Sequence, residues 1–265
     1  MNDAPPVTAA FDIQAIRAQF PILKEQVRGK PLVFLDSAAS AQKPRVVIEA
    51  MVHAMEHQYA NVHRGLHWMS ERTTEAYEAC RDAAARFLNA GSRDEIVLTR
   101  NSTAGINLVA HSYGRGVMKP GQAVLISAME HHSNIVPWQM LAQQVGATIR
   151  VIPMNERGEL RVDALPGLLN ERTKMLGVVH VSNALGTITP AKAIVEMAHR
   201  VGAKVLVDGA QSVSHMRVNV QDLDADFFVF SGHKLFAPTG IGALYAKKDL
   251  MDSLPPYQSG GNMIR

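Results

Sequence analysis

A lysine that follows a predicted buried strand is a residue of this sequence that could do chemistry. Lys234 lies in the stretch FSGHKLFAPTG, directly after the apolar run DFFVF. A buried ammonium group is costly unless it is paired or neutralised, and lysines in such positions often have a lowered pKa that suits amine chemistry. The alternative is a surface lysine that happens to follow a strand. The residues at the other strand ends have to decide between these two interpretations.

Polar side chains also follow other predicted strands. In open α/β sheets, ligands bind outside the carboxyl ends of the strands, so these residues are candidates for a site. The candidates at five strand ends are Asn101, Ser102 and Thr103; Glu130, His131 and His132; Ser182 and Asn183; Asp208 and Gln211; and Ser231, His233 and Lys234. Taken singly, Ser102 or Thr103 could be a helix N-cap and Asn183 a turn former. Taken together, they predict one ligand site.

These residue types match the needs of pyridoxal phosphate. That cofactor requires a lysine to hold its aldehyde as a Schiff base, an acid to keep its pyridine nitrogen protonated, and a cup for its phosphate. Lys234 and Asp208 could supply the first two. Thr103, Ser231 and His233 could form the cup, because hydroxyl groups and the free amides of a helix N-terminus bind phosphate well.

The elements that position these residues follow an alternating pattern. Apolar runs rich in β-branched residues alternate with helical patterns from about residue 94, and the runs are EIVLT, AVLIS, TIRVIP, MLGVVHV, KVLVD, DFFVF and, after the lysine loop, GIGALYAK. Strands that alternate with helices indicate βαβ units. The sequence therefore predicts an α/β fold with a mostly parallel sheet and helices on both faces.

Two helices are predicted before this region, at about residues 44–59 and 70–89. Their apolar residues recur at helical spacing and predict one buried face on each helix. Cys80 lies on the predicted face of the second helix, with Ala76, Tyr77, Ala83, Ala84, Phe87 and Leu88. We therefore expect Cys80 to be a small buried residue rather than a reactive thiol.

Several motifs resemble those of one enzyme family. VDGAQS, FSGHK and PTGIGALY are similar to segments of the fold-type I pyridoxal phosphate enzymes of the class V aminotransferase group. More narrowly, LDSAASAQKP, VHRGLH, STAGINLVA, MEHHSNIVPWQ, HVSNALGT and VDGAQSVSH resemble, in order and spacing, the SUF-type cysteine desulfurases. The likeness runs from about residue 11 to the end of the chain. It implies the large, cofactor-binding domain of a fold-type I transferase.

The resemblance implies a role for each matching residue. Lys234 would form the Schiff base, Asp208 would contact the pyridine nitrogen and Gln211 the phenolic oxygen. His131 would stack on the ring and act in catalysis, whereas Asn183 and His63 would lie beside the substrate. The phosphate would be held by Thr103, Ser231 and His233. The implied reaction converts L-cysteine to alanine and leaves the sulfur as a persulfide, with Lys234 moving the α proton at a pKa lowered by cationic surroundings.

The resemblance also implies that part of the enzyme lies outside this sequence. In the family, the nucleophilic cysteine and the arginine that grips the substrate carboxylate belong to a C-terminal domain beyond the point that matches Arg265. Cys80, as a predicted core residue, is no replacement. We therefore expect residues 1–30 to form an N-terminal helical segment and residues 31–265 the pyridoxal phosphate domain of a longer enzyme. The resemblance further implies a homodimer and a sulfur-acceptor protein that serves iron-sulfur cluster assembly.

Composition limits the other possibilities. Of the 265 residues, 47% are hydrophobic and 19% charged, and the net charge is +3 with Lys and Arg scattered along the chain. This pattern favours a small-molecule partner over nucleic acid or a membrane surface. The N-terminus lacks the features of a signal peptide, so a cytoplasmic location is expected. The single cysteine excludes an internal disulfide and a multi-cysteine metal site within this sequence.

Three rival interpretations stay open. A metalloenzyme is one, because His53 and His57, and likewise His63 and His67, are four residues apart. No HExxH glutamate accompanies either pair, so we expect no metal site. A transaminase, a selenocysteine lyase or a kynureninase-like lyase could use the same scaffold. A cofactor-binding fragment without turnover is the third.

Overall fold

The structure is a computed structural model, and it describes residues 11–63 and 65–260. The helices are α1 (Ile13–Ala18), α2 (Arg45–His57), α3 (Trp68–Leu88), α4 (Ser102–Val109), α5 (Arg115–Val117), α6 (Val136–Val145), α7 (Leu165–Leu168), α8 (Ala191–His199), α9 (Val220–Leu223) and α10 (Lys248–Ser253). The strands are β1 (Gln26–Val27), β2 (Lys30–Pro31), β3 (Ile96–Thr99), β4 (Ala123–Ser127), β5 (Thr148–Ile152), β6 (Thr173–Val179), β7 (Lys204–Asp208), β8 (Phe227–Ser231) and β9 (Gly242–Ala246).

Short 3-10 and π segments complete the element order. The 3-10 segments are η1 (Pro21–Lys24), η2 (Arg93–Glu95), η4 (His132–Asn134), η5 (Val162–Ala164), η6 (Ser212–Ser214) and η7 (Gly232–Lys234). A π-helical turn, η3 (Ala110–Gly114), joins α4 to α5. The segment η7 follows β8 directly, and η4 comes soon after the end of β4, so both turn the chain where predicted site residues lie.

A seven-stranded sheet forms the centre of the fold, in the order β3-β9-β8-β7-β6-β4-β5. Each strand corresponds to one of the apolar runs of the sequence. Neighbouring strands are parallel except at β9, which is antiparallel to both β3 and β8. The prediction of an α/β fold with a mostly parallel sheet is confirmed. Because β9 alone is reversed, the carboxyl ends of the other strands meet at one edge.

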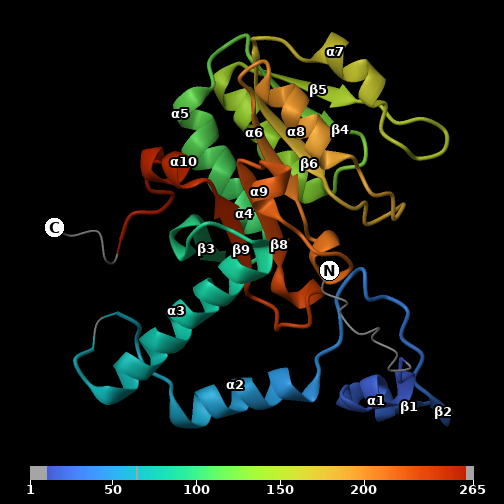
Figure 1. Cartoon of the computed structure of the whole chain (residues 1–265), viewed down its shortest axis with the longest axis vertical. Helices are drawn as coiled ribbons and strands as arrows, with labels where there is room; N and C mark the ends of the chain where they lie inside the picture. Colours follow the sequence, from blue (N-terminus) through green and yellow to red (C-terminus); the bar gives the residue numbers. More distant parts are fainter. Residues whose placement is uncertain (1–10, 64, 261–265) are drawn as a thin grey trace, which may run out of the picture.

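Both faces of this sheet are covered, as the sequence predicts. Alternate residues of one strand belong to different hydrophobic clusters: Val205 and Val207 of β7 pack in the cluster with α8, whereas Leu206 packs in the cluster with α4 and α6. Figure 1 shows α4 and α6 on one side of the sheet and α8 on the other. Burial on both faces explains why the strands read as continuous apolar runs.

The predicted buried faces of α2 and α3 are wrong for most of their length. Both helices form close to the predicted bounds, but α2 has no buried residue and Cys80 of α3 is exposed. Only the C-terminal end of α3, at Ala85 and Leu88, packs against the sheet. Figure 1 shows that α2 and the start of α3 extend away from the sheet. Helical spacing identified the apolar side, but outside the C-terminal end of α3 the described residues leave it largely uncovered.

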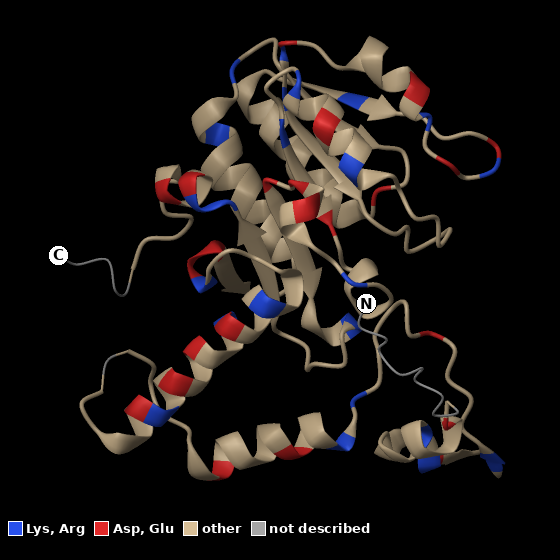
Figure 2. Cartoon of the chain, in the orientation of Figure 1, with Lys and Arg blue, Asp and Glu red and all other residues tan. Residues whose placement is uncertain are grey.

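The N-terminal region begins with α1 and η1 and continues into the β1–β2 hairpin, which crosses the predicted division between residues 30 and 31. The division into an N-terminal segment and a large domain remains a prediction. Within the described part of the chain, no helix is long and apolar enough to cross a membrane. Figure 2 shows basic and acidic residues interspersed over the elements, in agreement with the scattered charges of the sequence.

Candidate functional site

A pocket of about 500 Å³ lies at the carboxyl edge of the parallel strands. It is lined by Asp36, Ala38, Ala39, Asn101, Ser102, Thr103, His131, Ser133, Val179, Val181, Asn183, Asp208, Ala210, Gln211, Ser231, His233 and Lys234. Every residue to which the family resemblance gives a role is in this set except His63. Three other strand-end candidates, Glu130, His132 and Ser182, lie outside it. The strand-end rule therefore locates the pocket correctly, because successive parallel strands deliver their last residues to one edge.

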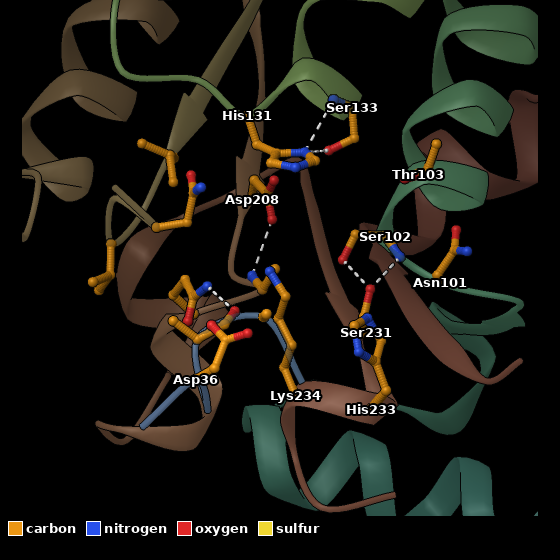
Figure 3. Close-up of a pocket in the computed structure, with 17 residues that line it drawn as sticks. Asp36, Asn101, Ser102, Thr103, His131, Ser133, Asp208, Ser231, His233 and Lys234 are labelled. Atoms are coloured by element: carbon orange, nitrogen blue, oxygen red, sulfur yellow. Dashed lines mark hydrogen bonds between the residues drawn. The ribbon is translucent and has the colours of Figure 1, made fainter. Parts of the chain in front are cut away.

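Lys234, Asp208 and His131 share one side of the pocket. Figure 3 shows the Lys234 side chain pointing toward Asp208, with the His131 ring beside that carboxylate. Asp208 is 2% exposed and accepts a hydrogen bond of 3.0 Å from the backbone N–H of Ala210. Burial raises the pKa of Asp208, whereas the Ala210 N–H, Lys234 and His131 act against that rise. A buried acid that faces a lysine is the arrangement expected of a site built for an ionic group.

Burial also lowers the pKa of Lys234, and the negative charge of Asp208 opposes this shift. The direction agrees with the sequence prediction, but the predicted cause is wrong. Cationic surroundings do not lower this pKa; the loss of water around the ammonium does. A lysine with a lowered pKa has more of its amine in the neutral, reactive form.

Hydroxyl and amide groups occupy the other side of the pocket, around the N-terminus of α4 (Figure 3). The Ser231 hydroxyl accepts a hydrogen bond from the Ser102 backbone N–H at 2.8 Å and lies 2.9 Å from the Ser102 hydroxyl. Asn101 caps the helix by accepting from the Ala104 N–H at 2.8 Å, so neither Ser102 nor Thr103 is the N-cap. The Ser102–Ser231 bonds join the start of α4 to the end of β8. They place backbone amides and the Thr103 side chain at the pocket wall, where an anion could bind.

The segment around Asp36 closes the pocket, and the sequence analysis assigned no role to it. Gln211 Nε2 donates to the carbonyl oxygen of Ala38 at 2.8 Å, and the Ala41 N–H donates to the carbonyl of His233 at 2.9 Å. Lys43 Nζ also donates to that carbonyl, at 3.1 Å. The only sequence signal for this contact is the motif LDSAAS, because the partners are almost 200 positions apart in the chain.

His63 lies apart from the pocket lining. It precedes α3 with a positive φ of 60°, its Nε2 is 3.0 Å from Glu78 Oε1, and its backbone N–H donates to the Thr74 hydroxyl at 2.9 Å. In this structure His63 is therefore held by α3. Its proposed place beside the substrate stays a prediction.

The histidine pairs form no metal centre in the described part of the chain. The His53 and His57 rings pack 4.8 Å apart on the exposed α2 helix. Among residues 11–63 and 65–260, no group of three or more His, Cys, Asp or Glu side chains is arranged to hold a metal ion.

Comparison with known proteins gives the family. The profile described as Aminotransferase class-V matches residues 33–265. The chain belongs to this family. The resemblance stated from the motifs is thus confirmed, and family members with solved structures provide a comparison for the fold and for the pocket at its strand ends.

Curated relatives carry one name. A cysteine desulfurase of Synechococcus elongatus is 55% identical over 96% of this chain, and a cysteine desulfurase of Pectobacterium carotovorum is 54% identical over 97%. The chain spans 41% of the first relative and 63% of the second. It therefore corresponds to less than two thirds of either protein.

Solved structures of cysteine desulfurases have the same fold. The crystal structure of CsdA from Escherichia coli matches with a TM-score of 0.87 at 42% identity, covering 97% of this chain and 63% of that one. The apo structure of the enzyme from Thermococcus onnurineus matches with a TM-score of 0.88 at 37% identity, covering 96% and 61%. These matches confirm the fold-type I architecture.

Proposed function

We propose that this chain is the cofactor-binding part of a pyridoxal phosphate-dependent cysteine desulfurase, which takes sulfur from L-cysteine and leaves L-alanine. The single observation that carries the proposal is that Lys234 and the buried Asp208 line the same pocket. Relatives named cysteine desulfurase, more than 50% identical, support the choice of substrate.

The pocket residues fit pyridoxal phosphate from end to end. Lys234 would hold the cofactor aldehyde, and Asp208 would hold a proton on the ring nitrogen. The hydroxyl groups and α4 amides around Thr103 and Ser231, with His233, would hold the phosphate on the other side. The cavity of about 500 Å³ falls in the size range of ordinary cofactor pockets. Its lining thus offers one cation, one buried anion and a cluster of neutral donors, which is the sequence of groups that this cofactor requires.

Pyridoxal phosphate, when bound, would supply an electron-accepting ring next to the substrate amine. The protein would do the rest. Lys234 Nζ would move the substrate α proton, because burial lowers its pKa and so favours the neutral amine that can accept a proton. The His131 imidazole would lie on the ring face, and Gln211 would donate its amide N–H to the phenolic oxygen, with Asn183 beside the substrate.

The assembly and the cell biology are also part of the proposal. We infer a homodimer, a sulfur-acceptor protein and a role in iron-sulfur cluster assembly from the likeness to SUF-type desulfurases. The nucleophilic cysteine is proposed to lie in the part of the relatives that this chain does not span. The location is proposed to be the cytoplasm.

Lys234→Ala tests the cofactor site. We expect the purified protein to lose the yellow absorbance of its bound pyridoxal phosphate, because no other lysine lines the described pocket. Lys43→Ala is the matched control: burial lowers its pKa too and it bonds to His233, yet it lies outside the pocket lining. Loss of the absorbance in Lys43→Ala but not in Lys234→Ala would refute the assignment.

The substrate needs a separate assay. The protein as its own cells make it should form alanine from L-cysteine, with equal amounts of sulfide released in the presence of a reductant. Transfer of an amino group to a keto acid instead would identify a transaminase. Bound cofactor without either product would identify the non-catalytic alternative.

A further inference from the structure

Glu130 is a buried acid at the end of β4, a strand-end candidate of the sequence that lies outside the pocket lining and has no part in the proposed function. It is 8% exposed and lies between the end of β4 and the 3-10 turn η4. Its Oε1 accepts hydrogen bonds from the Ser127 hydroxyl and, at 2.8 Å, from the Val179 backbone N–H. Its Oε2 accepts from Asn134 Nδ2 at 2.6 Å. A fully bonded buried acid of this kind tends to specify one local structure.

The direction of each hydrogen bond in this network is determined by groups that can only donate. Trp138 Nε1 donates to Asn134 Oδ1 at 2.8 Å, and an indole cannot accept. The amide of Asn134 must therefore turn its Nδ2 toward Glu130. The Val179 N–H likewise requires an acceptor. Residue 130 has to present an accepting oxygen in two different directions, which a carboxylate does and an amide does not.

The network is packed as well as bonded. Asn134 and Trp138 are both fully buried, and they lie against Gly177 of β6. A Cβ at Gly177 would come within 3.0 Å of Asn134 Oδ1 and 3.2 Å of Trp138 Nε1, so a glycine leaves room for the pair. The β4–β6 ladder runs to Ile126 and Gly177, and beyond it the Glu130 side chain binds the next part of β6.

His131 lies within this hydrogen-bonded network. The preceding residue, Glu130, is bonded to Val179 of β6. The carbonyl of His131 itself accepts from the Asn134 N–H at 2.8 Å, so the backbone is held on both sides of His131. The His131 ring is further oriented by Ser133, whose hydroxyl is 2.8 Å from Nδ1. The network also extends toward Asp208, because Val179, which Glu130 binds, is paired with Asp208 in the β6–β7 ladder.

We infer that Glu130 is a positioning residue, which holds the His131 imidazole over the pocket and keeps the β6 end in register with Asp208. The inference deepens the proposed function and rests on it. Burial raises the pKa of Glu130 to about 8, whereas the bonds from Ser127, Asn134 and Val179 act in the opposite direction. The inference rests on the geometry of the bonds, in which the Val179 N–H and Asn134 Nδ2 meet different oxygens of the Glu130 side chain.

Two variants separate the bond pattern from mere loss of a side chain. Glu130→Gln keeps the size but offers one acceptor oxygen, so either the Val179 N–H or Asn134 Nδ2 meets another donor. The double variant Glu130→Gln with Asn134→Asp restores every bond. The carboxylate at position 134 accepts from Trp138 Nε1 and from the amide N–H at position 130. The amide oxygen at position 130 accepts from the Ser127 hydroxyl and the Val179 N–H. The pair of substitutions also keeps the total charge.

The measurements use the full-length protein loaded with pyridoxal phosphate. We expect Glu130→Gln to retain the cofactor but to weaken its visible circular dichroism band, which reports how the ring sits against the His131 side of the pocket. We expect kcat for L-cysteine to fall about 10- to 100-fold with little change in KM, the size of effect that a misplaced catalytic group produces. The double variant should recover both the band and kcat.

Several results would overturn the inference. One is a Glu130→Gln protein with the wild-type band and kcat, even if it unfolds at a lower temperature, because that would make Glu130 a purely structural residue. Another is failure of the double variant to recover what Glu130→Gln loses. If Glu130→Gln does not fold, Ser127→Ala, which removes one bond to Oε1, should weaken the band to a lesser degree, and an unchanged band would refute the role.

A cofactor-free readout keeps this inference distinct from the proposed function. If the wild-type protein binds no pyridoxal phosphate, the proposed function fails. The Glu130 inference is then decided by the rate at which diethyl pyrocarbonate modifies His131, an exposed imidazole, as measured by peptide mass spectrometry. Faster modification in Glu130→Gln, with recovery in the double variant, supports the inference, and equal rates overturn it.

Discussion

Gly209→Ala is expected to destabilise the fold at the point where the site is anchored. Gly209 lies between the buried Asp208 and the pocket residue Gln211. A Cβ built on it would lie 1.9 Å from Phe228 Cζ, with two further ring atoms at 2.4 and 2.7 Å. Carbon atoms in contact are normally about 3.5–4.0 Å apart. Phe228 is fully buried in β8, so its ring has no free space into which to move.

The size of the effect follows from this overlap. Overpacking a tight core by one methyl group costs about 1–3 kcal/mol, and a clash with a ring held on all sides belongs at or above the upper end. Gly209 has an ordinary negative φ, so backbone strain adds nothing. We therefore expect a loss of about 3 kcal/mol or more, which is a fall of roughly 6–12 °C in Tm for a domain of this size.

Thermal unfolding of the apo-protein, followed by circular dichroism, measures this loss. Gly116→Ala is the matched control, because a Cβ there meets no atom within 4 Å and the residue lies in α5. Its expected change is a small gain of up to about 1 kcal/mol. Gly209→Ala should also weaken pyridoxal phosphate binding, since relief of the clash requires the backbone between Asp208 and Gln211 to shift.

A second substitution checks the cause. Phe228→Leu removes the clashing ring atoms, so it should cost less in the Gly209→Ala background than in the wild type. A Gly209→Ala protein with a wild-type Tm, or strictly additive effects of the two substitutions on Tm, would refute the reasoning that a clash with the Phe228 ring causes the loss of stability.

Three further outcomes are expected. Asp226→Ala should lower the free energy of unfolding by about 3 kcal/mol in urea titrations, because Asp226 is fully buried and lies 2.6 Å from His199 Nε2. The control Lys192→Ala breaks an exposed ion pair and should lower it by less than about 1 kcal/mol. Burial lowers the pKa of His180, so as the pH falls below about 6.5 this residue takes up a proton in the unfolded chain before it does so in the folded protein, and the folded protein loses stability. His180→Gln should therefore lose less stability than the wild type between about pH 7 and 5. Equal slopes of unfolding free energy against pH for the two proteins would contradict this. Cys80→Ser should leave alanine formation unchanged, because the thiol lies outside the pocket and partial loss of water around this exposed residue raises rather than lowers its pKa. A large loss of activity would assign Cys80 a part in sulfur transfer.

The sequence by itself determined the sheet and most of the site. The inner strands are apolar runs buried on both faces, and parallel strands bring their carboxyl ends to one edge. Residues that follow those runs, such as Asp208 and Lys234, therefore lie at the same edge of the sheet, although they come from different strands. The local pattern of the sequence was sufficient to predict the site because ligands bind at the carboxyl ends of parallel strands, and these ends follow from the strand directions.

The tertiary structure alone decided which surfaces are covered and which distant groups bond. Helical spacing shows which side of α2 or α3 is apolar, but whether Cys80 is buried depends on what packs there, and the described residues leave it exposed. The contact of the Asp36–Ala39 segment with Gln211 joins parts of the chain with no shared periodicity. The role of Glu130 depends on Asn134 and Val179 meeting around one carboxylate, and hydrogen bonds between such residues leave no trace in spacing or composition.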